Sequence, residues 1–217
     1  MSLFPIFLKM AARPCLVVGA GEIAESKILS LLEADAQVTV VAPEASERVR
    51  ELSASGEIVW HRREFADDDL DGIFLVVAGT NVLAVNRAVF AGAHKRDILC
   101  NAVDDPPYCD FYFPSVVRRG DLQIAISTAG ESPALAQQLR MELNEQLPRD
   151  VGPWLGELGR LRREVLEMEP VGEPRKQLLH QLAQREVCGA EECPSRQMAR
   201  EHAERHYPHT HAQGVEP

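Results

Sequence analysis

The chain has 217 residues, of which 45% are apolar and 26% are charged, as in an ordinary globular protein with one large domain or two small ones. Lys and Arg number 23 against 33 Asp and Glu, and the resulting formal charge of −10 argues against binding to a nucleic-acid backbone. No apolar run is long enough to cross a bilayer, and Leu3–Leu8 does not read as a signal peptide. We therefore expect a cytoplasmic protein that binds neither nucleic acid nor membrane.

Short apolar runs alternate with helical patterns over the first hundred residues. The runs that read as buried strands are Cys15–Val18, Val38–Val41, Ile58–Trp60, Ile73–Ala78 and Leu99–Val103. Apolar residues recur at three- and four-residue spacing in the intervening segments Glu22–Ala34, Ser46–Ser55 and Val82–Lys95. Continuous apolar strands separated by helices predict an α/β fold of the Rossmann type, with a parallel sheet covered on both faces.

A Gly-x-Gly-x-x-Ala motif follows the first predicted strand and opens the first predicted helix. The first glycine permits a tight turn, the second lets a pyrophosphate approach the backbone, and the alanine allows close packing of helix on sheet. The helix N-terminus faces the phosphates. Because the strand and helix context is the required one, the motif predicts dinucleotide binding; the alternative is a structural glycine turn. The expected cofactor contacts here are Gly19, Gly21, Glu22, Ile23 and Ala24.

The end of the second strand bears on which dinucleotide binds. Ala42 and Pro43 stand there instead of the acidic residue expected about 20 residues after the first glycine, and Glu44 is the nearest carboxylate. No Arg follows the strand to bind a 2′-phosphate. The sequence therefore favours NAD over NADP, with Ala42 and Pro43 as contacts.

Polar residues also follow the fourth and fifth strands. Thr80 or Asn81 can hydrogen-bond a ribose, or can cap the helix that follows. Asp104 follows the fifth strand, at the edge where open α/β sheets bind their ligands, and a carboxylate there can take a proton or bind a cation. The alternative is a solvated turn acid, because the following residues, Asp105-Pro106-Pro107, are typical of turns.

The pattern changes after Asp110. Strand-like runs at Phe111–Val117 and Leu122–Ser127 are joined by a predicted hairpin turn at residues 118–121. Ser132 is a predicted N-cap with Pro133 in the first helical position, and this helix runs to Leu147. Further helical patterns cover Trp154–Met168 and Lys176–Val187.

The last thirty residues are polar and contain a set of metal-binding residue types: Cys188, Cys193, His202, His206, His209 and His211. Imidazole and thiolate are ligands for borderline metals, and the first two of these histidines share a face if their segment is helical. The spacing matches no zinc-finger template. A polar tail without a metal is the simpler interpretation, and a metal site at the four histidines is the alternative.

Several of these motifs occur in the order found in the siroheme-synthase family: Pro5-Ile6-Phe7, Val18-Gly19-Ala20-Gly21, Val41-Ala42-Pro43, Asn101-Ala102-Val103-Asp104, Phe113-Pro114-Ser115 and Ser132-Pro133-Ala134-Leu135-Ala136. The chain resembles the family's N-terminal module, a precorrin-2 dehydrogenase that in some members is also a sirohydrochlorin ferrochelatase. The resemblance covers about residues 2–150 well, weakens to about residue 185 and does not include the tail.

The resemblance implies NAD-dependent oxidation of precorrin-2 to sirohydrochlorin by a homodimer, with insertion of iron or cobalt as a further activity. The family's key carboxylate aligns with Asp104, which would accept a proton and is also a candidate metal ligand. Arg140 matches a basic position of the family and would pair with a substrate carboxylate; a solvated helix face is the alternative. The predicted cradle for other substrate carboxylates is Ser127, Thr128, Gly130 and Ser132, in which Thr128 keeps a hydroxyl where the family often has Ser.

The resulting domain prediction has four parts: an NAD-binding domain at 1–110, a β-hairpin and helix for dimerisation and substrate binding at 111–147, a helical domain at 148–187, and the tail at 188–217. Two other classes of function stay open. One is a dinucleotide sensor without catalysis, which has no need of Asp104. The other is a metal-handling module that delivers ions through its tail.

Overall fold

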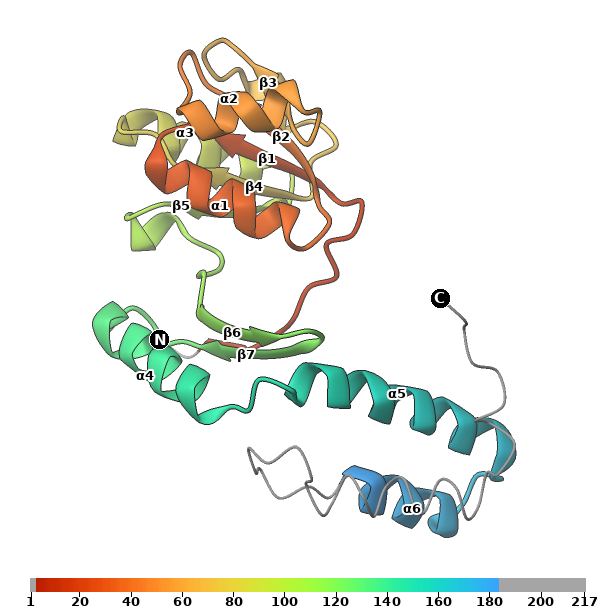
Figure 1. Cartoon of the computed structure of the whole chain (residues 1–217). Coiled ribbons are helices and arrows are strands. Elements are labelled where there is room, and N and C mark those ends of the chain that lie inside the picture. The colour runs from red at the N-terminus through yellow and green to blue at the C-terminus, as the bar shows by residue number, and fades with distance from the viewer. Residues whose placement is uncertain (1–2, 184–217) are drawn as a thin grey trace. The chain divides into compact units, whose positions relative to one another are not determined.

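The protein is described here from a computed structural model, which describes residues 3–183. The predicted metal ligands of the tail lie outside these residues. The chain forms two compact units, with the boundary between Phe113 and Pro114 (Figure 1).

The first unit is built on a parallel sheet with the strand order β3-β2-β1-β4-β5. Its strands are β1 (Pro14–Val18), β2 (Gln37–Val41), β3 (Val59–His61), β4 (Leu75–Ala78) and β5 (Leu99–Ala102). The helices are α1 (Glu22–Leu32), α2 (Glu47–Ala54) and α3 (Leu83–His94), with short 3-10 turns at Asp67–Leu70 and Pro106–Tyr108. The strand order reverses direction between β1 and β4, so the predicted doubly wound fold is confirmed.

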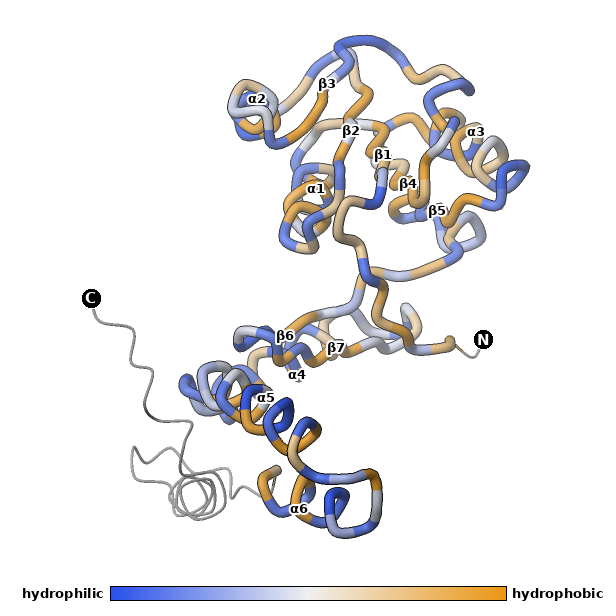
Figure 2. Tube along the Cα trace, turned by 90° about the vertical axis from the view of Figure 1, so that its right-hand side faces the viewer, coloured by the Kyte–Doolittle hydropathy of each residue, from blue (hydrophilic) through white to orange (hydrophobic). Residues whose placement is uncertain are grey.

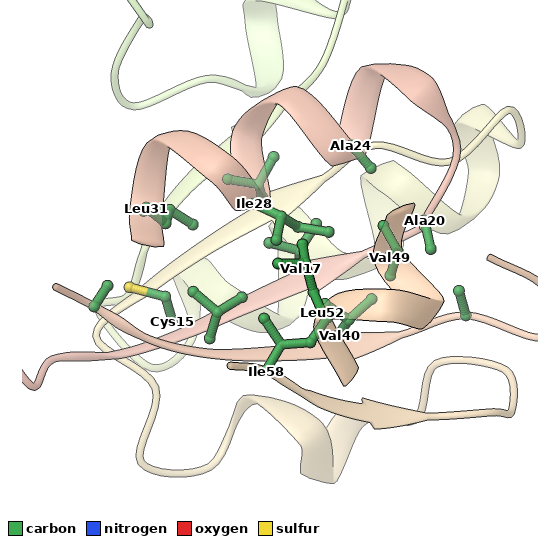
Figure 3. Packing of buried hydrophobic residues seen from close by; sticks show 14 of the residues in the cluster. Cys15, Val17, Ala20, Ala24, Ile28, Leu31, Val40, Val49, Leu52 and Ile58 are labelled. Carbon is green, nitrogen blue, oxygen red and sulfur yellow. The ribbon is translucent and has the colours of Figure 1, made fainter. Parts of the chain in front are cut away.

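Two hydrophobic layers hold this unit together, one on each face of the sheet. Alternate residues of a strand point to opposite faces, so Val17 packs with one layer and Leu16 with the other, and both are fully buried. Helices α1 and α2 cover the first layer and α3 covers the second (Figure 2). Figure 3 shows Ala24 and Ile28 of α1 directed at the strands. Burial of each large aliphatic side chain contributes about 1.5–3 kcal/mol.

The second unit begins with an antiparallel pair, β6 (Ser115–Arg119) and β7 (Leu122–Ile126). The predicted hairpin is present, but its turn is shorter than expected and consists of Gly120 and Asp121. Gly120 has a φ of +58° at the first turn position, which favours glycine in a two-residue hairpin turn.

The first strand of the hairpin also starts later than the sequence predicts. The expected strand Phe111–Val117 is wrong at its amino end, because Phe111 and Phe113 pack against the core of the first unit and leave the ladder to begin at Ser115. An apolar pattern does not indicate which hydrophobic core a residue packs into. Here tertiary packing determines where β6 begins.

Three helices complete the second unit: α4 (Pro133–Gln146), α5 (Val151–Met168) and α6 (Glu173–Ala183). Ser132 caps α4 as predicted, since its hydroxyl accepts a hydrogen bond from the Leu135 amide at 3.2 Å. Leu161, Val165 and Leu182 form a small buried cluster between α5 and α6. Among residues 3–183, no helix is both long and apolar enough to span a membrane.

A close backbone contact ties α5 to the hairpin turn, and it generates a prediction about stability. A Cβ at Gly152 would lie 2.7 Å from the carbonyl oxygen of Arg119, whereas a Cβ at Gly156 in the same helix would meet nothing within 4 Å. We expect Gly152→Ala to lower the free energy of unfolding. Gly156→Ala should raise it by about 0.5–1 kcal/mol through helix propensity. Urea unfolding of both variants measures this, and equal gains from both would contradict the contact.

Candidate functional site

The carboxyl ends of four parallel strands lie in register at one edge of the sheet. Val18 of β1 pairs with Val41 of β2 and with Ala78 of β4, and Ala78 pairs with Ala102 of β5. The amide of Gly19 continues this ladder by donating to the Val41 carbonyl at 2.9 Å. The loops that carry the predicted site residues of this unit therefore start side by side, at the switch point where open α/β sheets bind ligands.

Gly19 is required by the fold. Its φ is +105°, and a Cβ there would lie 2.6 Å from the carbonyl oxygen of Gly79 in the loop after β4. Gly79 in turn allows α1 to come close, because a Cβ at Gly79 would lie 3.4 Å from the Cβ of Ala24. The first and last positions of the motif thus have the packing roles that the sequence predicts.

Gly21 has no such structural reason to be glycine. Its φ of −80° and ψ of −179° suit any residue, and a Cβ would meet nothing within 4 Å. It is the N-cap of α1, and no side chain caps the helix there. The first amides of α1 therefore have no side-chain cap, at the positive end of the helix dipole. This arrangement fits a pyrophosphate, with Glu22 and the half-exposed Ile23 beside it.

Hydrogen bonds connect the loop after β2 to the same place. The Ser46 amide donates to the carbonyl of Ala20 at 2.9 Å, and its hydroxyl donates to Glu25 Oε2 at 2.7 Å. Ala42 is only 4% exposed, so it is Pro43 that presents surface here. Arg62, which the sequence analysis missed because it comes from the chain after β3, donates from Nε to the Pro43 carbonyl at 3.4 Å.

The loop after β4 is organised by a buried asparagine. Asn86, which is 1% exposed, accepts from the Thr80 hydroxyl at 2.7 Å and donates to the Thr80 carbonyl at 3.0 Å. Helix α3 begins with Val82 as its N-cap, so neither Thr80 nor Asn81 is the N-cap itself. The Thr80 side chain shapes the turn, and Asn81 is exposed at its tip.

Asp104 lies two residues beyond the end of β5 and is exposed. Its φ is +59°, a left-handed conformation that Asp tolerates better than most residues but that still costs about 1–3 kcal/mol. A conformation of this kind persists only where neighbouring contacts impose it.

Those contacts come from both sides of the loop. Asp105 is 9% exposed and pairs with Arg87 of α3, with Nε and Oδ2 2.9 Å apart, while the Arg87 guanidinium lies 4.8 Å from the Tyr108 ring centre. Asn101 donates from Nδ2 to the carbonyl of Phe111 at 2.7 Å. The side chain of Asp105, next to Asp104, is therefore held to α3, and the backbone at Phe111 is held to β5.

Lys27 is a charged group, electrostatically linked to Asp104, that the sequence analysis missed. It extends from α1, and its Nζ lies 4.4 Å from the ring centre of Phe113. Burial lowers the pKa of Lys27, and the negative charge of Asp104 opposes that change. A single lysine in a helix looks like a solvated residue in sequence, so no local pattern reveals this position.

The second unit holds the predicted cradle, residues 127–132. The hydroxyls of Ser127 and Thr128 accept from the amides of Ala129 and Ser132, at 3.1 and 3.2 Å. Each hydroxyl keeps its own proton to donate to an anion. Gly130 has a φ of +87° with open space around it. Arg140 of α4 is partly exposed and has no carboxylate within 4.0 Å among the described residues.

The cysteines of the first unit belong to its packing. Cys15 and Cys100 are fully buried, and burial raises the pKa of their thiols to about 11 and about 12. Within residues 3–183, no three side chains of His, Cys, Asp or Glu gather closely enough to hold a metal ion.

The switch-point loops, the uncapped start of α1 and the open space at Gly21 together define a dinucleotide-binding protein of the Rossmann type. Residues 6–115 match the family model described as "Putative NAD(P)-binding", and residues 119–146 match the model of the sirohaem biosynthesis protein central region.

Similar proteins show which family of dinucleotide-binding proteins this chain resembles. Siroheme synthase 1 of Yersinia enterocolitica is 45% identical over 177 residues, which are 81% of this chain and 38% of that protein. Siroheme synthase 1 of Serratia proteamaculans is 42% identical over 177 residues, 81% of this chain and 37% of that protein. The chain thus spans little more than a third of these relatives. The solved structure of SirC, precorrin-2 dehydrogenase, has a TM-score of 0.78 and 27% identity, covering 94% of this chain and 100% of that one.

The chain belongs to the family of siroheme-synthase N-terminal modules, and NAD is the cofactor of its first unit. The predicted membership and cofactor are confirmed. The contacts of individual residues with NAD stay predictions.

The open space at Gly21 generates a prediction about how a substitution there changes NAD affinity. Gly21→Asp should fold, because its side chain meets open space, but it should bring a negative charge to the pyrophosphate position. We expect NAD to bind at least about tenfold more weakly, or about 1.4 kcal/mol. Calorimetric titration with NAD measures this, with the unfolding temperature as the check on folding. Unchanged NAD affinity in a folded variant would place the phosphates elsewhere.

Proposed function

We propose that this protein oxidises precorrin-2 to sirohydrochlorin with NAD. The observation that carries the proposal is the exposed carboxylate of Asp104, held in a left-handed turn at the same sheet edge as the dinucleotide loops. The likeness to SirC along its entire length supports it. The reaction removes two electrons and one hydrogen nucleus as hydride, and a proton leaves with them.

The residues that would hold NAD are those of the switch-point loops. The amides at the start of α1, from Glu22 to Ala24, which no side chain caps, would bind the pyrophosphate, and the absence of a side chain at Gly21 makes room for it. The exposed Pro43 would lie against a ribose, with the loop of Thr80 and Asn81 at the other end of the cofactor. When bound, NAD supplies the acceptor for the hydride.

Asp104 would accept the proton at a carboxylate oxygen. Its exposure leaves the carboxylate open to a substrate, and the next residue, Asp105, is tied to α3 by its ion pair with Arg87. The left-handed turn would thus direct the Asp104 carboxylate, and the Asp105–Arg87 ion pair would limit the movement of the loop.

Sirohydrochlorin and its precursor are polycarboxylates, so hydroxyl and cationic groups are the chemistry that would bind them. We propose the cradle residues Ser127, Thr128, Gly130 and Ser132 for this role, together with Arg140. Free hydroxyl protons and a guanidinium without a carboxylate partner among the described residues support the assignment.

A metal ion would be a second substrate. Metal insertion also removes protons from the macrocycle, so the same Asp104 carboxylate would serve it, and we propose iron or cobalt as the ion. The histidines of the tail, which lie outside the described residues, stay the alternative place for metal handling. We assign the protein to the cytoplasm, where this chemistry would meet NAD.

The domain roles follow the same proposal. Residues 1–110 would bind NAD, residues 111–147 would serve dimerisation and substrate binding, and residues 148–187 would form the helical domain. Residues 188–217 would not be needed for oxidation.

Replacement of Asp104, the proposed base, distinguishes between an enzyme and a dinucleotide sensor without catalysis. Asp104→Asn keeps the size of the side chain and tolerates a positive φ, so the fold should survive. We expect precorrin-2 oxidation to slow by about 10²–10⁴-fold, as for loss of a positioned base, with NAD affinity unchanged. The rise of sirohydrochlorin absorption measures this.

Asp97→Asn is the matched control for Asp104→Asn. Asp97 is also exposed with a positive φ of +55°, but it precedes β5 and so lies at the opposite edge of the sheet. Its variant should oxidise precorrin-2 at the rate of the unchanged protein. Full activity of Asp104→Asn would move the proton acceptor elsewhere and favour the sensor.

Assembly as a homodimer is the remaining proposal. A sheet of only two strands is marginal on its own, and among the hairpin residues Val116, Leu122 and Ile124 stay partly exposed while Val117 is buried. The aromatic residues Phe111 and Phe113 do not contribute, because the first unit covers them. We expect sedimentation at micromolar concentration to give twice the mass of the chain, and a monomer would contradict this.

A further inference from the structure

Lys27 differs from three arginines of the first unit in having no carboxylate partner among the described residues. Arg63, Arg87 and Arg96 each pair with an aspartate. Lys27 is partly buried, and among the described residues no carboxylate oxygen lies within 4.0 Å of its Nζ. Its ammonium lies instead over the face of Phe113, at 4.4 Å from the ring centre.

An aromatic ring holds a cation in place but does not neutralise it. The attraction is worth about 0.5–2 kcal/mol, while partial burial removes water from the ammonium, which is why the pKa of Lys27 is lowered. The one negative charge that opposes this effect is that of Asp104. The ammonium is thus fixed in direction by Phe113, has spare hydrogen-bond donors and acts electrostatically on the proposed base.

A polycarboxylate that approaches Asp104 would be repelled by it and by a chain of net charge −10. A cation that Phe113 holds in place, and whose charge acts on that carboxylate, offsets part of this repulsion. We propose that Lys27 is a substrate-binding residue, whose ammonium pairs with a peripheral carboxylate of the tetrapyrrole next to Asp104. This inference rests on the proposed function, and it adds a residue of the first unit to those that recognise the substrate.

Lys27→Met tests the inference, because methionine keeps the length of an unbranched stem and removes the charge. The probe is sirohydrochlorin, titrated by its absorption change in the absence of NAD. We expect at least a tenfold weaker affinity for sirohydrochlorin and a similar rise in KM for precorrin-2, with NAD affinity unchanged. Lys27→Arg, which restores a cation, should recover most of the loss.

Lys95→Met is the matched control, since Lys95 is an exposed lysine at the end of α3. It should bind sirohydrochlorin as the unchanged protein does. Raising the salt concentration should weaken binding to the unchanged protein more than to Lys27→Met. If Lys27→Met lowers the unfolding temperature, Lys27→Gln, which keeps a polar end, provides the same comparison.

Two outcomes would overturn different statements. Equal sirohydrochlorin affinity in Lys27→Met, Lys27→Gln and the unchanged protein would remove Lys27 from substrate recognition and leave the proposed oxidation intact. An unchanged protein that neither binds sirohydrochlorin nor oxidises precorrin-2 would overturn the proposed function and this inference together.

Discussion

The loops after β1 and β4 approach each other so closely that only hydrogen fits between them, and the rest of the site depends on this contact. A Cβ at Gly19 would sit 2.6 Å from the Gly79 carbonyl oxygen, and the space on the other side of Gly79 is taken by Ala24. Three small residues thus set how close α1 comes to the sheet. That distance brings the uncapped amides of α1 to the strand ends, where a pyrophosphate can reach them.

Charge has a second organising role. The chain is acidic overall, yet the proposed reaction acts on an anion with a carboxylate as base. Such a site needs local cations that are not already neutralised by the protein's own aspartates. Arg87 is paired with Asp105 and so serves to shape the loop, whereas Lys27 and Arg140 have no salt bridge among the described residues.

The sequence predicts most of the fold because the signals are local. The alternation of apolar runs and helical spacing locates the five parallel strands, and Ser132 with Pro133 marks the start of α4. The start of β6 escapes prediction because Phe111 and Phe113 join a core formed by distant residues. The residues of the candidate site likewise fall into those that the sequence predicts and those that it does not. The glycine motif is read from neighbours in sequence, while Asn86 and Lys27 act across the fold on loops that no local pattern connects to them.

Helix α3 holds two loops of the candidate site through the consecutive residues Asn86 and Arg87. Asn86 fixes the loop after β4, and Arg87 fixes the loop after β5 through Asp105. The two loops also begin side by side, because the Val103 amide donates to the Ala78 carbonyl at 2.9 Å. Both loops of the candidate site are therefore anchored to the same segment of α3, one of them at the residue next to Asp104.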